Sequence, residues 1–349
     1  MNRISIVILN WNGKGYLEKF LPDLILHSQV PGAEIVVADN GSTDDSLEFL
    51  GQVYPHIRII SLEENHGFSG GYNRAFEQLD STYFLLLNSD IEVTSGWLDP
   101  LLLCMDQDES VGACSPKIKD FNNKSHFEYA GAAGGFIDRY GYPFCRGRVF
   151  DHLEEDQGQY DDEIDVFWST GACILIRSEL YWQVGGLDEQ FFAHMEEIDL
   201  CWRIKRSGYK VRYIPRSTVY HVGGGTLKRG NPMKTFLNFR NNLLLLYKNL
   251  PSRQRRRIIF LRKILDGISA LRFLLQGATK DFRAVIRAHR AYSGMKQSYK
   301  GTEGSNNQHN NDVIVSGIYQ GSIVADFFLR GKKTFDQVNQ DFTQLNKEK

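Results

Sequence analysis

Residues 1–90 alternate short apolar runs with segments of helical periodicity, and this alternation restricts the possible folds more than any other feature. A strand buried on both faces of a parallel sheet has a nearly continuous apolar sequence. By this criterion the sequence predicts four strands, at Ile4–Leu9, Glu34–Ala38, Ile57–Leu62 and Tyr83–Leu87. The segments between them place apolar residues three and four positions apart, which predicts helices. We therefore expect an α/β sheet with right-handed crossovers.

Polar motifs follow three of these strands. Asn10-Trp11-Asn12 follows the first strand, Asp39-Asn40-Gly41-Ser42 the second and Asn88-Ser89-Asp90 the fourth. Because ligands of open α/β sheets bind at the carboxyl ends of the strands, these motifs mark the expected site. A glycine-rich stretch, Asn65–Arg74, opens the third predicted helix, where a helix N-terminus favours an anion. This stretch lacks the GK[ST] ending of a P-loop.

Carboxylates at two strand ends are compatible with a bound nucleotide and a metal. Asp90 suits either a cap for a helix beginning near Ser95 or a hard divalent cation that neutralises a diphosphate. Asp39 suits either a turn or the binding of a ribose hydroxyl or a base edge. No GxGxxG sequence lies near Asp39, which argues against a nicotinamide or flavin enzyme.

Three acids within four residues, Glu196, Glu197 and Asp199, begin another predicted helix. Adjacent carboxylates repel each other, so one pKa should rise toward the range of a general base. The alternative is that these acids only complement the dipole at a helix N-terminus. His221 precedes three glycines and is either a structural residue or a metal ligand. The glycines predict a loop able to close over a ligand.

The order and spacing of these motifs closely resemble glycosyltransferase family 2, in particular its rhamnosyltransferase-like bacterial members, over about residues 3–225. The resemblance implies a GT-A fold, with a mostly parallel α/β sheet and helices on both faces. It also implies an inverting transfer from a nucleotide-diphosphate sugar. By family likeness the donor is dTDP-rhamnose, with UDP- and GDP-hexoses left open, and the acceptor is a hydroxyl of a glycan or lipid-linked glycan in cell-surface polysaccharide synthesis.

The resemblance also implies roles for individual residues. Asp90 would coordinate Mg or Mn; because Asn88 replaces the first Asp of the family motif, His221 would be a second metal ligand. Glu197 matches the position of the general base, with Glu196 as the alternative. The remaining implied residues would bind the donor: Asn10, Asp39, Asn65, Gly71, Arg74, Asn88, Ser89 and Asp90.

The composition restricts the possible partners, the cysteine chemistry and the cellular compartment of the protein. A formal net charge of -1 gives no argument for nucleic acid as a partner, and five cysteines without a CxxC motif argue against a disulfide framework or a zinc site. The first residues are typical of a strand rather than a signal peptide, and no window reaches the roughly 20 apolar residues of a spanning helix. We therefore expect a cytoplasmic protein.

A basic segment near the C-terminus needs its own explanation. Residues 251–300 hold thirteen Lys and Arg against two acids, and the periodicity predicts an amphipathic helix at Arg257–Leu275. Such a helix can lie on an anionic membrane surface, or its apolar face can pack on the catalytic domain or on a second subunit. Peripheral contact through residues 251–290, at the inner face of the plasma membrane, would suit a lipid-linked acceptor, and a homodimer is the other possibility.

The predicted division is a catalytic domain over residues 1–230, a basic helical extension over 231–295 and a polar linker and tail over 296–349. Within the first, the nucleotide-binding half covers about residues 1–120 and the acceptor half about 121–230. Two rival functions are weaker. A nucleotidyltransferase would need a basic, glycine-rich loop where Asn10–Gly13 stands, and a non-catalytic nucleotide-sugar-binding protein would not need both Asp90 and the paired acids.

Overall fold

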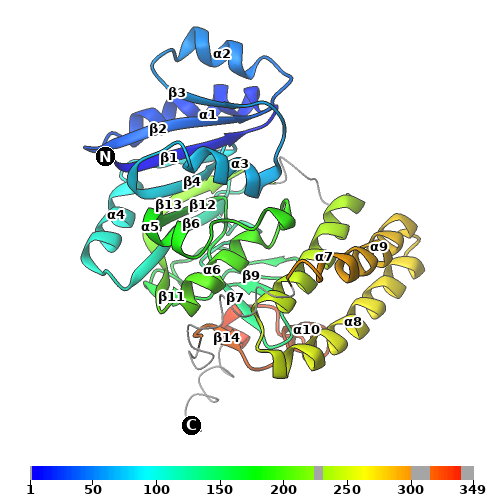
Figure 1. The fold of residues 1–349 in the computed structure, drawn as a ribbon. Helices are drawn as coiled ribbons and strands as arrows, with labels where there is room; N and C mark the ends of the chain where they lie inside the picture. Colours follow the sequence, from blue (N-terminus) through cyan, green and yellow to red (C-terminus); the bar gives the residue numbers. More distant parts are fainter. Residues whose placement is uncertain (1, 224–230, 300–314, 339–349) are drawn as a thin grey trace.

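The computed structural model describes residues 2–223, 231–299 and 315–338; the predicted glycine loop beyond Gly223 and the centre of the predicted polar linker lie outside these ranges. A nine-stranded sheet forms the body of the molecule (Figure 1). Its strand order is β11-β13-β6-β12-β4-β1-β2-β3, and β5 also pairs with β13. The bounds are β1 (Asn2–Asn10), β2 (Ala33–Asn40), β3 (Arg58–Leu62), β4 (Ser81–Asn88), β5 (Ile91–Val93), β6 (Val111–Asp120), β11 (Ile164–Val166), β12 (Cys173–Arg177) and β13 (Lys210–His221).

The four predicted strands form the parallel part of this sheet. β1 lies between β2 and β4, and β3 extends the sheet beyond β2, all in parallel. Successive side chains point to opposite faces, so Ile6 and Ile8 belong to one core cluster while Val7 belongs to the other. Helices α1 (Lys14–His27) and α4 (Leu98–Gln107) cover the first face.

The opposite face is covered by α3 (Gly67–Phe76), α5 (Ser178–Gln183) and α6 (Glu196–Arg206). A further helix, α2 (Ser46–Val53), lies between β2 and β3 in the chain. This layered arrangement confirms the expected α/β class with helices on both faces.

The other half of the sheet is mixed rather than parallel. β12 runs antiparallel between β4 and β6, whereas β6 and β13 are parallel. β13 is one long strand of 12 residues. Its pairing with β6 shifts register between Ile214 and Thr218, next to Pro215, because proline cannot donate a ladder hydrogen bond.

A second, five-stranded sheet lies in the region predicted as loops and a hairpin, and its order is β10-β9-β8-β7-β14. Residues far apart in the chain build it, since β14 near the C-terminus pairs in parallel with β7. The short helix α10 (Ile323–Phe328) follows β14, so this part of the predicted linker and tail packs with the small sheet. The strands are β7 (Gly135–Asp138), β8 (Pro143–Cys145), β9 (Arg148–Val149), β10 (His152–Leu153) and β14 (Ile318–Tyr319).

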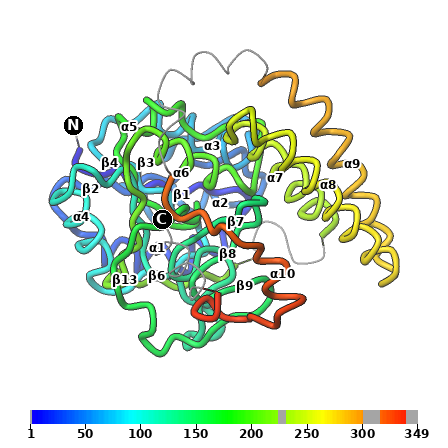
Figure 2. Tube along the Cα trace, turned by 90° about the horizontal axis from the view of Figure 1, so that it is seen from below, coloured from blue at the N-terminus to red at the C-terminus, as the bar shows by residue number. Residues whose placement is uncertain are grey.

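Three long helices form the C-terminal extension: α7 (Pro232–Asn249), α8 (Ser252–Leu275) and α9 (Thr279–Met295). They lie together on one side of the molecule in both views (Figures 1 and 2). α7 packs against α6 as well as against α8 and α9, so the extension is joined to the helix that begins with the paired acids. Within the described ranges, no helix combines the length and apolar character needed to cross a membrane.

Candidate active site

The carboxyl ends of β1 and β2 bring Asn10 beside Asp39. The two residues are register partners and both are buried. Asn10 donates from Nδ2 to Asp39 Oδ1 over 2.9 Å and to Ser42 Oγ over 3.1 Å. The other oxygen of Asp39 accepts from the Ser42 backbone N–H at 3.0 Å, so Asp39 also caps the turn after β2. The buried Oδ1 atom of Asn10 has no hydrogen-bond partner among the described residues, which leaves one acceptor for a ligand.

Hydrogen bonds of two asparagine side chains, Asn65 in the turn and Asn40 at the end of β2, stabilise the glycine-rich turn before α3. Asn65 Oδ1 accepts from the Gly67 N–H at 2.8 Å and from Asn40 Nδ2 at 3.1 Å. A Cβ atom at Gly71 would lie 2.6 Å from Leu9 Cδ1, so the missing side chain lets α3 approach β1. Asn65 and Gly71 therefore shape the turn and its packing in this structure.

Arg74 links α3 to the segment that precedes α6. Its guanidinium lies 2.9 Å from Glu189 Oε1 and 3.1 Å from the Gly70 carbonyl oxygen. Glu189 begins the 3-10 turn Glu189–Phe191. Nearby, Asn73 Nδ2 donates to the Leu187 carbonyl oxygen over 2.8 Å. Arg74 is thus engaged with a carboxylate here rather than standing alone as a phosphate ligand.

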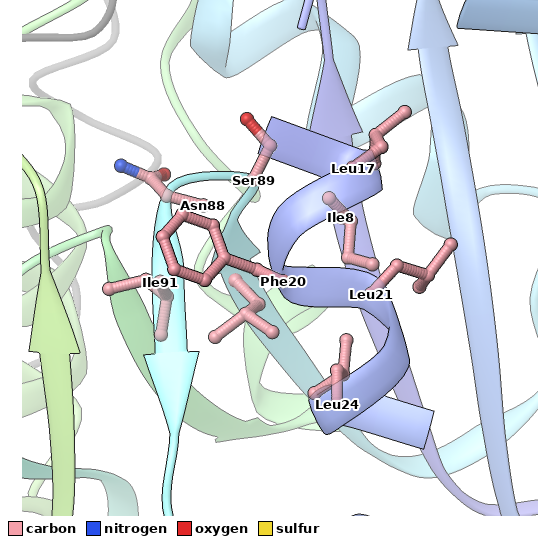
Figure 3. Close-up of a pocket in the computed structure, with 9 residues that line it drawn as sticks. Ile8, Leu17, Phe20, Leu21, Leu24, Asn88, Ser89 and Ile91 are labelled. Carbon is pink, nitrogen blue, oxygen red and sulfur yellow. The ribbon is translucent and has the colours of Figure 1, made fainter. Parts of the chain in front are cut away.

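Asn88-Ser89-Asp90 forms the end of β4 and the turn into β5. The Asn88 N–H donates to the Ala172 carbonyl oxygen over 2.9 Å. Asn88 and Ser89 lie at the rim of a small pocket whose walls are apolar side chains of α1 and β1 (Figure 3). Because Leu17, Phe20 and Leu21 line it, this pocket belongs to helix packing and does not suit a charged diphosphate.

Asp90 is one end of a buried row formed by a carboxylate, an imidazole and a second carboxylate. The pairing of β13 with β5 places His221 opposite Ile91 and therefore next to Asp90. His221 Nε2 lies 3.1 Å from Asp90 Oδ1, and His221 Nδ1 lies 3.4 Å from Glu128 Oε1. Burial alone would lower the pKa of His221, but the carboxylates of Glu128 and Asp90 outweigh it and raise this pKa to about 10. Burial would raise the pKa of Asp90, yet His221 holds it below the ordinary value.

Two members of this row, Asp90 and His221, are candidate metal ligands. Asp90 and His221 supply an oxygen and a nitrogen donor at the end of β4, and the carboxylate suits Mg or Mn. Glu128 faces the other imidazole nitrogen, as partners behind a metal-binding histidine usually do. However, no group of three or more His, Cys, Asp or Glu side chains in the described structure is arranged to hold a metal. The pair therefore fits a metal only if water or the donor's phosphate oxygens complete the coordination.

Glu196 and Glu197 begin α6 with raised pKa values. Burial first, and then the charges of Glu197 and Asp199, raise the pKa of Glu196 well above its ordinary value. Burial also raises the pKa of Glu197 to about 7, although backbone hydrogen bonds oppose this shift. Each carboxylate has an oxygen without a hydrogen-bond partner in the described structure. As whole residues, Glu196 is buried and Glu197 is partly exposed, so Glu197 is the better candidate for contact with a substrate.

Glu197 lies close to the strand end that carries the metal candidates. A Cβ atom built on Gly171 would be 3.7 Å from Glu197 Cβ. The next residue, Ala172, accepts the hydrogen bond from Asn88. One short segment of chain, Gly171-Ala172, therefore connects the surroundings of Glu197 to the end of β4.

The backbone before α6 adopts an uncommon conformation and is fastened by α7. Phe192, His194 and Met195 all have positive φ, at 64°, 70° and 74°. Positive φ in non-glycine residues costs free energy and persists only where the surroundings enforce it. Asn241, fully buried in α7, donates from Nδ2 to the carbonyl oxygens of Phe191, Ala193 and His194 over 2.9, 2.8 and 2.7 Å.

A second contact from α7 secures both ends of the same segment. Lys248 Nζ lies 2.8 Å from Asp188 Oδ2 and 2.8 Å from Asp199 Oδ2, and Asn249 donates to Asp199 Oδ1 over 2.7 Å. Burial would raise the pKa of Asp199, but Arg203 and Lys248 lower it to about 2. Asp199 is thus a permanently charged structural anchor, consistent with its omission from the predicted catalytic residues.

Glu128, Asn241 and Lys248 were not recognised from the sequence. Glu128 lies in the stretch without clear periodicity, and nothing local distinguishes it from a surface acid. Asn241 offered a signal, because Asn241 and Asn242 directly precede the apolar run Leu243–Leu246 and a buried amide needs partners. Their targets lie about fifty and one hundred residues away in the chain, at Phe191 and Gly141, so only the fold identifies them.

Comparison with known proteins gives the context of this arrangement. The chain is 28% identical over 232 residues to the N-acetylglucosaminyl-diphospho-decaprenol L-rhamnosyltransferase of Mycobacterium tuberculosis, covering 62% of this chain and 75% of that protein. It is 24% identical over 229 residues to the rhamnosyltransferase WbbL of Escherichia coli, covering 62% and 83%.

The fold also matches solved structures. The crystal structure of GalNAc-T7 with UDP, GalNAc and Mn²⁺ is similar with a TM-score of 0.54 and 17% identity, over 71% of this chain and 48% of that one. At this identity the likeness concerns the fold, which is GT-A. The family model for glycosyl transferase family 2 matches residues 5–185, more than half of the 349 residues. The chain is therefore a glycosyltransferase and belongs to glycosyl transferase family 2.

Proposed function

We propose that this glycosyltransferase moves L-rhamnose from a nucleotide diphosphate to a hydroxyl of a glycan acceptor, with inversion at the anomeric carbon. The observation that carries the mechanism is Glu197, a partly buried residue whose carboxylate has a buried oxygen without a hydrogen-bond partner among the described residues and a pKa raised to about 7. The named activities of the two relatives support rhamnose. A dTDP-sugar is the first donor to test, followed by UDP-sugars.

Glu197 is the proposed general base. Its carboxylate takes the proton of the acceptor hydroxyl, the hydroxyl oxygen forms a bond to the anomeric carbon, and the bond from that carbon to the diphosphate oxygen breaks. The electron pair leaves with the nucleoside diphosphate, and the proton stays on Glu197. A base with a pKa near the working pH is the most effective in such a transfer. Glu196 is the alternative base, but it is buried and its pKa is raised further.

The donor is proposed to bind across the ends of β1, β2 and β4. Asp39 and Asn10 would bind the nucleoside, and the free Oδ1 of Asn10 suits an N–H donor of a base. Asn88 and Ser89 would line the diphosphate. A Mg²⁺ or Mn²⁺ ion held by Asp90 and His221 would neutralise the charge of the leaving diphosphate.

The proposed acceptor is a lipid-linked glycan used in cell-surface polysaccharide synthesis, at the cytoplasmic face of the membrane. The name of the mycobacterial relative includes a diphospho-decaprenol acceptor, and the basic helices offer a surface for membrane contact.

A thermal-shift experiment tests the donor and metal together. We expect dTDP and UDP to raise the melting temperature of the wild-type protein more with Mn²⁺ than without it, because a ligand that binds only the folded state stabilises it. Asp90→Asn should lose the increment due to Mn²⁺, whereas the exposed control Asp23→Asn should keep it. Equal responses of wild type and Asp90→Asn to Mn²⁺ would show that the metal site is wrongly assigned.

A further inference from the structure

Helix α8 has a buried face that fixes its orientation. Arg262 and Asp266 are both buried and form an ion pair with 2.8 Å between Nε and Oδ1. His289 of α9 lies 3.0 Å from the other oxygen of Asp266. The Arg262 guanidinium stacks over the Tyr142 ring at 3.6 Å from its centre. These contacts join α8 to α9 and to the small sheet, so the opposite face of α8 must point outward.

The outward face of α8 is an apolar stripe. Its members follow each other at intervals of three or four residues, which places them on one side of a helix. The exposed fractions of these side chains are 65%, 48%, 61%, 54% and 80%, for Phe260, Ile264, Ile268, Leu271 and Leu275 in that order. The predicted alternative, in which this face packs on the catalytic domain, is therefore wrong for most of the stripe. Figure 1 shows α8 beside α7 and α9, away from β1 to β3.

Basic residues continue the stripe at the start of α8. Arg253, Arg256 and Arg257 are exposed and precede Phe260 at the same three- to four-residue intervals, so they lie on the same side of the helix. Among the described residues of α8 and α9, no exposed carboxylate balances them. The acids between residues 251 and 299 are Asp266, which is buried, and Asp281, which is partly buried and accepts a hydrogen bond from Thr235 Oγ1 at 2.6 Å.

We propose that this face of α8 is a docking surface for an anionic lipid bilayer. Exposed apolar side chains enter the headgroup region while arginines attract the negative surface, which is how interfacial helices bind. The helix would lie in the plane of the membrane, since no helix of the described chain is suited to cross it. A second copy of this chain is a poorer occupant. In the part of α8 and α9 that the structure describes, a second copy would offer no exposed acid to pair these arginines, whereas an anionic bilayer would supply negative charges.

The extension that carries the stripe is joined to the candidate site. α8 packs on α7, and α7 holds the backbone before Glu196 through Asn241. The inference rests on the proposed function in one respect, because a lipid-linked acceptor explains why an enzyme of this fold carries such a surface. The docking itself depends only on the stripe and its charges.

Co-sedimentation with vesicles tests the surface directly. The full-length protein is mixed with vesicles of phosphatidylcholine, or of phosphatidylcholine with phosphatidylglycerol, and bound protein is measured. We expect binding to the mixed vesicles that weakens with salt. The variant Ile264→Ser/Ile268→Ser/Leu271→Ser and the variant Arg253→Ser/Arg256→Ser/Arg257→Ser should each bind at least about tenfold more weakly. The control Leu26→Ser, at an exposed leucine of α1, should bind as wild type does.

Two further measurements separate the possible failures. Light scattering on wild type and the Ile264→Ser/Ile268→Ser/Leu271→Ser variant should show the same monomer mass. A wild-type dimer that this variant disrupts, with unchanged vesicle binding, would overturn the proposal in favour of a second copy.

Transfer to a short, water-soluble acceptor should persist in both surface variants. If wild type transfers sugar to no acceptor but still binds mixed vesicles, the proposed function fails and the docking surface stands. Unchanged vesicle binding by both variants overturns the docking surface alone.

Discussion

At the scale of single residues, the raised pKa of Glu197 links the proposed catalytic role to the stability of the fold. The folded protein raises the pKa of Glu197 from an ordinary 4.5 to about 7, mainly by burial. A carboxyl group whose pKa is higher in the folded state favours folding while it is protonated. That contribution is complete below about pH 4.5 and is lost as the pH rises through 7. The proposed base is therefore kept ready at a cost in stability.

Glu197→Gln should make this cost measurable. Glutamine resembles the protonated acid and cannot ionise, so we expect the variant to melt roughly 2–4 °C above wild type at pH 8. The difference should vanish at pH 4.5, where wild type is also protonated. Differential scanning fluorimetry across this range measures both values, with the exposed control Glu179→Gln expected to follow wild type. A variant less stable than wild type at pH 8 would contradict the origin assigned to the pKa shift.

At the scale of elements, α7 is what holds the backbone before α6 in its uncommon conformation. Three carbonyl oxygens of that segment share one donor group, the Asn241 amide. Positive φ at Phe192, His194 and Met195 would relax readily without it, since each such residue stores on the order of 1–3 kcal/mol. The position of the paired acids therefore depends on a helix that contributes no reacting group.

Asn241→Ala and Asn242→Ala form a matched pair for testing this dependence. Both asparagines are buried in α7, but Asn242 donates to the Gly141 carbonyl oxygen, far from the acids. We expect both variants to lose about 1–3 kcal/mol of stability, because each removes buried hydrogen bonds to backbone carbonyl oxygens. Only Asn241→Ala should lower kcat at least about tenfold while the KM for donor changes little. Similar kcat values for the two variants would show that Asn241 has only a structural role.

The strands around β1 could be predicted from the sequence, whereas the contacts of α7 could not. The four parallel strands were predictable because burial on both faces leaves an apolar run, and their polar ends follow from topology. The strand-end positions of Asn10, Asp39 and Asn88 were therefore predictable, whereas their role in donor binding stays a prediction. In the structure, Asn65 and Gly71 shape the turn before α3, and Arg74 pairs with Glu189. The contacts of Glu128 and Asn241 could not be predicted, because they join segments whose proximity is set by tertiary packing.

At the scale of the whole molecule, the C-terminal segment completes the small five-stranded sheet. β14 adds a strand to the small sheet, and the buried Phe335 packs on Phe136 at 5.0 Å and on Tyr160 at 6.0 Å between ring centres. Tyr319 Oη donates to the buried Asp326, and Asp138 accepts from the Ile323 N–H. Residues 315–338 are thus part of the folded unit that carries the site.

Phe335→Ala should therefore destabilise the protein as a core substitution does. We expect a loss of about 3–5 kcal/mol in chemical denaturation, the usual effect of removing a buried phenylalanine. Phe328→Ala, in the same segment but half exposed, is the comparison and should cost less. Equal losses would indicate that residues 315–338 do not pack on the small sheet as described.

The role of Glu197 in sugar transfer is the claim on which the rest depends, and steady-state transfer by Glu197→Gln tests it most directly. Donor consumption and product formation are measured from pH 5 to pH 9 for wild type, Glu197→Gln and the control Glu179→Gln. We expect wild-type kcat/KM to rise with pH and level off above about 7, where the carboxylate is ionised. Glu197→Gln should lose about 10²–10⁴-fold in kcat without the pH-dependent rise, and still bind nucleoside diphosphate. Full transfer activity in Glu197→Gln, with the wild-type pH profile, would contradict the account.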